Sequence, residues 1–332
     1  MYRTAAIGLA LAAAAHAQYS ATYLPSNAPA QSEQGQAGTN KCGTTSDQNS
    51  TCQNAYINAV DDFCLWAPPN PGAGSTIGET EREEVAWCLK SGYGTRLIPD
   101  GTLQGVHFVQ TPDYVQITGI GDLTKLNIPK GDAGGELDPH GADGNGNPIG
   151  GLVFSTAFGP LQQLHEWTNF MSDSQFCFRA CKEGGNGPAL CNHIYDVMGC
   201  EWNMPGNYDA GTFESCKSDS GEPMGVYGGS TFHQGDGNTP APHPAPQSSM
   251  CTTSATLGNG AAVAGAATNS TTATTAPATT TPTSGSTSKT TGGAAATKSS
   301  SASAMEVPRV WTRGGLAAVV ALVGAAVGAA LV

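Results

Sequence analysis

Hydrophobic residues recur along the first half of the chain with two different periods. A spacing of four residues, which predicts one face of a helix, relates Cys52, Tyr56, Val60 and Cys64. Thr80 and Glu83 form a capping box, so a second helix is predicted to begin there and to end at Gly92. A third, short helix is predicted over residues 161–170.

The middle of the chain changes to a strand-like period. Three short runs rich in β-branched residues, over 105–109, 114–118 and 123–128, are separated by turn-forming residues. Such runs predict strands joined by tight turns, in a sandwich, a barrel or a solenoid. The predicted fold class is therefore mainly β with a few short helices (α+β).

The N-terminal residues have the pattern of a secretory signal. Arg3 supplies the positive start, an apolar run follows over 5–15, and Ala15 and Ala17 fit the small residues of a cleavage site. The run is too short to span a bilayer. We therefore predict a signal peptide over 1–17 and a secreted protein.

The C-terminal residues have the pattern of a glycosylphosphatidylinositol (GPI) attachment signal. Residues 316–332 are apolar or small, a polar spacer precedes them, and a run of small residues over 299–303 comes before the spacer. We predict attachment at Ser301 and removal of 304–332. The alternative, a transmembrane helix at the end of the chain, is disfavoured because an Ala/Gly-rich segment of this length is marginal for spanning.

Between the folded part and the tail, residues 252–303 are dominated by Ser, Thr, Ala, Pro and Gly. Such a composition cannot bury enough apolar surface to fold, so we predict an extended, O-glycosylated stalk. The chain also has N-glycosylation sequons at Asn49 and Asn269.

The cysteines define the folded head. The chain has 10 of them, and an exported protein is expected to pair them as disulfides. We predict a stapled head over 41–251, preceded by a flexible segment over 18–40, with four cysteines in one lobe and six in another. The pairing is not readable from the sequence, although Cys64 and Cys88 are candidates to meet; the full set is Cys42, Cys52, Cys64, Cys88, Cys177, Cys181, Cys191, Cys200, Cys216 and Cys251.

Charge excludes one class of partner. Of the 332 residues only 12% are charged, and the formal net charge is −12. A nucleic-acid-binding protein needs clusters of basic residues to neutralise phosphates, and this chain has none.

One glycine-rich stretch, residues 134–151, suggests a metal. Asp138, Asp143 and Asn145 offer oxygen ligands that suit a structural calcium ion, the one cofactor that the sequence suggests. The EF-hand pattern is broken, because Pro148 occupies the glycine position. The favoured interpretation is therefore a turn-rich loop without metal, with no cofactor, and a structural calcium ion is the alternative.

The sequence contains no complete catalytic motif. His165 and Glu166 begin an HExxH-like run, but Asn169 replaces the second histidine, so a zinc-protease site is not expected. Cys177 and Cys181, together with Cys191 and His193, could supply zinc ligands, although disulfides are favoured for exported cysteines. A glycoside hydrolase site made of two carboxylates is still possible, because the two residues need only be neighbours in space and not in sequence.

Four runs of the head resemble a family of secreted fungal surface glycoproteins labelled macrophage-activating glycoprotein; they are residues 94–101, 111–119, 137–151 and 193–200. The resemblance covers roughly residues 42–231. It implies a signal peptide, a Ser/Thr-rich tail and a GPI-type anchor. The resemblance does not imply any catalytic residues in this chain.

These patterns together favour a non-enzymatic, GPI-anchored glycoprotein of the fungal cell surface or wall. The expected partners are wall polysaccharide or other cell-surface molecules, with the membrane reached through the lipid anchor. The alternative is a secreted carbohydrate-active enzyme, a hydrolase or lyase of wall polysaccharide, or a carbohydrate-binding module.

Overall fold

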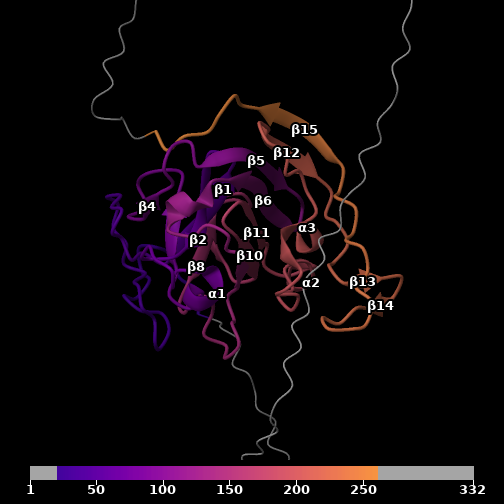
Figure 1. Cartoon of the computed structure of the whole chain (residues 1–332), viewed down its shortest axis with the longest axis horizontal. Helices are drawn as coiled ribbons and strands as arrows, with labels where there is room; N and C mark the ends of the chain where they lie inside the picture. The colour runs from indigo at the N-terminus through magenta and orange to yellow at the C-terminus, as the bar shows by residue number, and fades with distance from the viewer. Residues whose placement is uncertain (1–20, 261–332) are drawn as a thin grey trace, which may run out of the picture. The chain divides into compact units, whose positions relative to one another are not determined.

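Two β-sheets form the framework of the computed structural model, which describes residues 21–260 (Figure 1). The first sheet has six strands in the order β4-β3-β2-β1-β8-β9. Its strands are β1 (Asn54–Ala59), β2 (Asp62–Ala67), β3 (Val85–Cys88), β4 (Arg96–Leu97), β8 (Leu152–Ser155) and β9 (Gln162–Leu164).

The second sheet has seven strands in the order β15-β12-β5-β6-β11-β10-β7. Its strands are β5 (Leu103–Gln110), β6 (Tyr114–Gly121), β7 (Gly135–Leu137), β10 (Trp167–Met171), β11 (Gln175–Cys181), β12 (Phe213–Ser218) and β15 (Ser248–Thr253). The pairs from β5 through β6, β11 and β10 to β7 are antiparallel, whereas β12 pairs with β5 in parallel.

Short elements complete the head. They are the helices α1 (Ile77–Thr80), α2 (Gly187–Leu190) and α3 (Gly199–Asn203), the 3₁₀ helix η1 (Leu123–Leu126), and a small hairpin of β13 (Val226–Tyr227) and β14 (Ser230–Thr231). The predicted class, mainly β with a few short helices, is confirmed.

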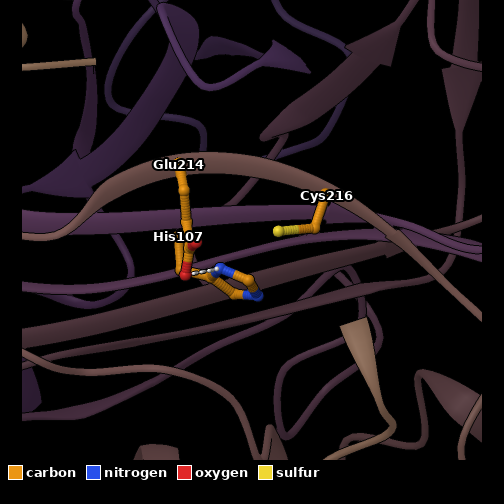
Figure 2. A group of neighbouring side chains, drawn as sticks. All are labelled: His107, Glu214 and Cys216. Carbon is orange, nitrogen blue, oxygen red and sulfur yellow. Dashed lines mark hydrogen bonds and ion pairs between the residues drawn. The ribbon is translucent and has the colours of Figure 1, made fainter. Parts of the chain in front are cut away.

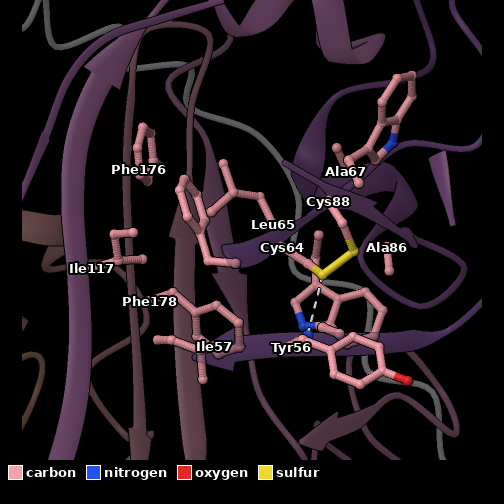
Figure 3. Packing of buried hydrophobic residues seen from close by; sticks show 14 of the residues in the cluster. Tyr56, Ile57, Cys64, Leu65, Ala67, Ala86, Cys88, Ile117, Phe176 and Phe178 are labelled. Atoms are coloured by element: carbon pink, nitrogen blue, oxygen red, sulfur yellow. Dashed lines mark hydrogen bonds between the residues drawn. A yellow bond between two sulfur atoms is a disulfide. The ribbon is translucent and has the colours of Figure 1, made fainter. Parts of the chain in front are cut away.

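The main hydrophobic core lies between the two sheets. Phe63 of β2 stacks on Phe176 of β11 with ring centroids 6.2 Å apart, and Trp66 of β2 lies 5.8 Å from Trp167 of β10. Figure 3 shows Phe176, Phe178 and Ile117 of the seven-stranded sheet facing Leu65 and Ile57 of the six-stranded one. All six residues of β2 are buried, so this strand is covered on its outer face as well as on the face that meets the other sheet.

The helix predicted from Cys52, Tyr56, Val60 and Cys64 is wrong. Tyr56 lies in β1 and Cys64 in β2, and these strands form a hairpin with Ile57 opposite Phe63. Val60 is in the turn between them, and Cys52 precedes β1. A spacing of four is also a multiple of the strand period of two, so it places residues on one face of a strand as readily as on one face of a helix. Both strands are buried, and this removed the polar alternation that marks a half-exposed strand.

Three other predicted elements also differ from the structure. Thr80 ends α1 instead of starting a helix, and β3 occupies Val85–Cys88. Residues 161–170 contain β9 and the start of β10 rather than a helix. The run 123–128 contains η1, which is a 3₁₀ turn and not a strand. The strands predicted over 105–109 and 114–118 are confirmed as parts of β5 and β6.

All ten cysteines are paired, in five disulfides: Cys42–Cys52, Cys64–Cys88, Cys177–Cys200, Cys181–Cys191 and Cys216–Cys251. The four early cysteines pair with each other and the six late ones do the same, as the two groups in the sequence suggested. The suggested meeting of Cys64 and Cys88 is also found, between neighbouring strands rather than between helices.

Residues before Lys41 pack on the head, although we expected a flexible segment over 18–40. Asn40 is fully buried and donates through Nδ2 to Asn54 Oδ1 (2.9 Å) and to the Gly150 carbonyl (2.9 Å). Gln36 is 4% exposed, and its Nε2 donates to Asn40 Oδ1 at 3.0 Å. Residues 21–40 therefore tie β1 to the loop before β8.

The C-terminal edge of the seven-stranded sheet is β15. Its residues are exposed throughout, but it pairs with β12 and is bonded to it through Cys216–Cys251. Farther along, the Asn259 backbone N–H donates to Asp100 Oδ1 (2.8 Å) and its side chain to the Ile98 carbonyl (2.9 Å). The last described residues therefore remain attached to the head.

Glu84 is a buried carboxyl group that makes the stability of the head depend on pH. It is 0% exposed, and its nearest polar partner is the Thr80 hydroxyl, which donates to Oε1 at 3.2 Å. Burial raises the pKa of Glu84 well above its ordinary value. The folded state thus keeps this proton at a pH where the unfolded state has lost it, so stability falls as pH rises above about 4.3, the unfolded pKa.

We therefore expect Glu84→Gln to become progressively more stable than the wild type as pH rises from 5 to 8. The melting temperature of both proteins at several pH values measures this difference. Glu79→Gln, at an exposed position of α1, is the control and should follow the wild type. A difference between Glu84→Gln and wild type that stays constant with pH would show that Glu84 does not titrate as described.

Candidate functional site: an acidic cleft beside a histidine cluster

A cleft of about 610 Å³ opens beside β7 and α3. Four acidic residues contribute to its wall, together with one histidine; they are Glu81, Glu136, Asp138, Asp196 and His193. No lysine or arginine is among the described residues that line it. We call this the acidic cleft.

The sheet topology brings the parts of this site together. Asp138 follows the end of β7, Glu166 precedes the start of β10, and Cys181 ends β11. Since β10 is antiparallel to both β7 and β11, these three positions share one end of the sheet. The Cys181–Cys191 disulfide then holds the loop after α2 at the same end, and this loop carries His193.

Glu136 is the buried acid of the cleft. It is 6% exposed, and the Thr168 hydroxyl donates to its Oε1 at 2.6 Å. Burial, followed by the charge of Asp138, raises the pKa of Glu136 well above its ordinary value, and a hydrogen bond with Asp138 adds to the shift. Burial and the Asp138 charge also raise the pKa values of Glu81 and Asp196. Protonated Glu136 therefore stands beside Asp138, an arrangement that can hold or pass a proton.

Asp138 shapes the loop that follows it. Its Oδ1 accepts hydrogen bonds from the backbone N–H groups of His140 (2.6 Å) and Gly141 (2.7 Å). The backbone of Asp138 also pairs with that of Asn147, which closes the loop. Gly141 has φ of 57°, a left-handed conformation that glycine adopts at little cost. These bonds fix the direction in which the chain leaves toward His140.

His140, Glu166 and His193 form what we call the histidine cluster. His140 Nε2 lies 3.8 Å from Glu166 Oε2, and His193 Nδ1 lies 4.0 Å from the same oxygen. The two imidazole rings stack with centroids 4.5 Å apart. Interaction with the neighbouring Glu166 carboxylate raises the pKa of His140. On its other side, His193 Nε2 lies 3.9 Å from Asp138 Oδ1, which links the cluster to the acidic cleft.

The three residues predicted to bind calcium occupy different surroundings. Asp138 lines the acidic cleft. Asp143 instead forms a two-bond ion pair with Arg82, at 2.9 and 2.7 Å, which lowers the pKa of Asp143 to about 2. Asn145 donates its backbone N–H to Asp143 Oδ1 and lines a separate small hollow. The calcium site stays a prediction, and the Arg82 guanidinium competes for one of its three ligands.

Other residues that the sequence singled out can also be placed. His165 lies before β10 and contacts Glu183 through Nδ1 at 2.7 Å, not in a helical zinc motif. Cys191 is bonded to Cys181 and offers no thiolate for zinc. Asn49 is exposed, as its sequon requires. Asn269, Ser301, the signal peptide and most of the predicted stalk lie outside the described residues.

A second group of ligand-type side chains contains His107, Glu214 and Cys216 (Figure 2). His107 Nδ1 lies 2.9 Å from Glu214 Oε1, and burial lowers the pKa of His107. Cys216 is bonded to Cys251, so its sulfur is not available as a thiolate. This group is therefore a polar pair between β5 and β12, in which His107 is buried and Glu214 is partly buried.

Within residues 21–260 we find no helix with the length and apolarity that a membrane crossing requires.

Two proteins of the fungus Mycosarcoma maydis are similar to this chain. Appressorium protein ROW2 is 53% identical over 250 residues, which are 73% of this chain and 86% of ROW2. Appressorium protein ROW1 is 57% identical over 231 residues, which are 68% of this chain and 53% of ROW1, so the chain spans about half the length of that relative. No family model matches the chain. No solved structure matches it. The fungal origin that the sequence indicated is supported, whereas neither relative carries the macrophage-activating label.

Proposed function

Because the chain belongs to the family of the fungal appressorium proteins ROW1 and ROW2, we propose that it is a surface protein of a fungal infection cell. In this proposal its head acts by binding, and the acidic cleft holds wall polysaccharide. The observation that carries the proposal is the composition of the cleft, in which four carboxyl groups line about 610 Å³ without a lysine or arginine.

Carboxyl groups of this kind select for a ligand class. They form hydrogen bonds with sugar hydroxyls, and those that are ionised attract ammonium groups because the charges are complementary. The proposed ligand is therefore a wall polysaccharide that contains free amino groups, in preference to a neutral glucan. The net charge of −12 acts in the same direction over longer distances.

The terminal segments complete the proposal. The signal peptide over 1–17 exports the chain, the glycosylated stalk over 252–303 extends from the head, and a GPI anchor at Ser301 holds the protein on the outer face of the plasma membrane or within the wall. Support for this part comes from the sequence patterns of both ends.

One observation favours a second function, that of a carbohydrate-active enzyme. Burial raises the pKa of Glu136, which stands beside Asp138, and a pair of carboxyl groups supplies the acid and the base or nucleophile of most glycoside hydrolysis. Only a catalytic head would release sugar products, so product formation distinguishes this function from binding.

The test incubates the full secreted chain with neutral glucan, chitin and partly deacetylated chitin. We expect the protein to be depleted from solution by the deacetylated polymer, without new reducing ends or unsaturated sugars. Depletion that is equal for neutral glucan would contradict the proposed ligand class. Accumulation of new reducing ends or unsaturated sugars would show that the head is an enzyme and would contradict the proposed binding function.

A charge reversal in the cleft provides the matched control. Glu81→Lys places a cation in the cleft wall, and we expect its retention on the deacetylated polymer to fall at least about tenfold, which is about 1.4 kcal/mol of binding free energy. Glu79→Lys makes the same change in net charge two residues away, at a position that does not line the cleft. It should bind like the wild type; an equal loss in both variants would show that only net charge matters.

A further inference from the structure

We propose that the histidine cluster, His140, Glu166 and His193, binds a divalent transition-metal ion such as Zn²⁺. Each residue offers one ligand atom, and these three atoms all lie within 4.8 Å of one another. They come from three loops that the sheet and the Cys181–Cys191 disulfide hold at one end of the head.

The distances in the cluster suit a shared ion. Two ligand atoms bound tetrahedrally to Zn²⁺ are about 3.3 Å apart, given bonds of about 2.0–2.1 Å. Glu166 Oε2 lies 3.8 Å from His140 Nε2 and 4.0 Å from His193 Nδ1, so metal binding needs these two pairs to close by about 0.5–0.7 Å relative to that geometry. The two histidine nitrogens lie within 4.8 Å of each other, so they also have to approach. Both histidine side chains are partly exposed, at 23% and 20%, which leaves the rings room to turn from their stacked arrangement toward an ion.

The chemistry of the ligands identifies the class of ion. Imidazole nitrogen is a ligand for zinc, copper and nickel, whereas calcium and magnesium prefer oxygen alone. Two imidazoles with one carboxylate also match the ligand types of catalytic and regulatory zinc sites, in which a water or a bound molecule takes the fourth position. This site differs from the predicted calcium site both in its residues and in its ion.

Groups around the cluster are placed to support a bound metal. Asp138 Oδ1 lies 3.9 Å from His193 Nε2, the ring nitrogen that does not face Glu166. A carboxylate opposite the second nitrogen of a metal-binding histidine fixes the ring and raises its basicity. Asp138 also holds the backbone of His140 through its 2.6 Å hydrogen bond. The Cys191 carbonyl lies 3.3 Å from His193 Nδ1 and can accept a hydrogen bond only from a protonated Nδ1, so zinc binding at this nitrogen has to displace that contact.

The experiment uses the full secreted chain, stripped of metal with a chelator and then dialysed. Zn²⁺ is added as its chloride, and the bound metal is counted by elemental analysis while competition with a chromophoric chelator gives the dissociation constant. We expect the wild type to bind zinc at a single site, to gain thermal stability with added Zn²⁺, and to show no comparable gain with Ca²⁺. Absence of zinc binding, or a preference for Ca²⁺, would overturn the proposal.

Variants test which residues hold the ion. The double variant His140→Asn/His193→Asn should lose the site, whereas His233→Asn, an exposed histidine outside the cluster, should keep it. Asp138→Asn should weaken zinc binding about 10–100-fold, since it acts through His193 rather than on the metal. If the double variant fails to fold, Glu166→Gln decides: unchanged zinc affinity in that variant would contradict the assignment.

Discussion

Removing the disulfide between Cys64 and Cys88 should destabilise the head by about 3–5 kcal/mol. Both cysteines are fully buried and lie directly opposite each other on β2 and β3. The Tyr56 backbone N–H also donates to Cys64 Sγ at 3.2 Å (Figure 3). Replacement by alanine therefore removes a cross-link, leaves space in the core and takes away a hydrogen-bond acceptor.

The measurement is the melting temperature of Cys64→Ala/Cys88→Ala, which we expect to fall by about 10 °C for a head of this size. The comparison is Cys216→Ala/Cys251→Ala. That bridge closes the longer loop, 35 residues against 24, so a purely entropic cross-link would make it the more important one. Cys251 is exposed, however, and we expect the smaller loss there. The opposite order would show that loop entropy outweighs burial in this protein.

The second large loss of stability is expected from replacement of Arg179. Its side chain is buried in β11 and contacts three groups: Nε donates to Gln116 Oε1 (2.8 Å), Nη1 donates to the Leu190 carbonyl (2.8 Å), and the guanidinium lies 4.3 Å from the centre of the Tyr114 ring. Arg179→Met would leave both oxygens without this donor and remove the cation–π contact. We expect a loss of about 2–4 kcal/mol in the free energy of unfolding.

Denaturant titration of Arg179→Met measures that loss. Lys182→Met removes the same charge from an exposed position three residues later, and its stability should stay within about 0.5 kcal/mol of the wild type. Burial of the guanidinium has its own cost, and it lowers the pKa of Arg179. Wild-type stability in Arg179→Met would mean that this desolvation cancels the three contacts.

The parts of the fold that the sequence predicted correctly are those where local pattern and tertiary environment agree. The runs in β5 and β6 are rich in β-branched residues and bounded by turns, and they are strands in the structure. Around Cys52 and Cys64 a spacing of four residues fitted both the helix period and the strand period. Most residues of β1 and all residues of β2 are buried, so the alternating polar positions that would have indicated a strand are missing. Thr80 met the rule for a helix cap but stands at the end of a four-residue helix.

The candidate site was less predictable because its residues meet only through long-range pairing. Glu166 and His193 each appeared in separate, incomplete motifs, and His140 lay within the loop examined for calcium. The pairing of β10 with β7 and β11, together with the Cys181–Cys191 bridge, brings the three residues together. Ten cysteines allow many pairings, so no sequence spacing identifies the bridge that carries His193 to the other two.

The attachment of β15 has a mechanical consequence. Tension applied to the chain after residue 260 would first break the bonds of Asn259 and then peel residues back along β15 from its C-terminal end. Peeling stops at Cys251, because its covalent bond passes the load to Cys216 in β12. That strand pairs in parallel with β5 along five residue pairs inside the sheet. A pull on the chain beyond residue 260 is therefore transmitted through a covalent bond from an exposed edge strand to a strand inside the sheet.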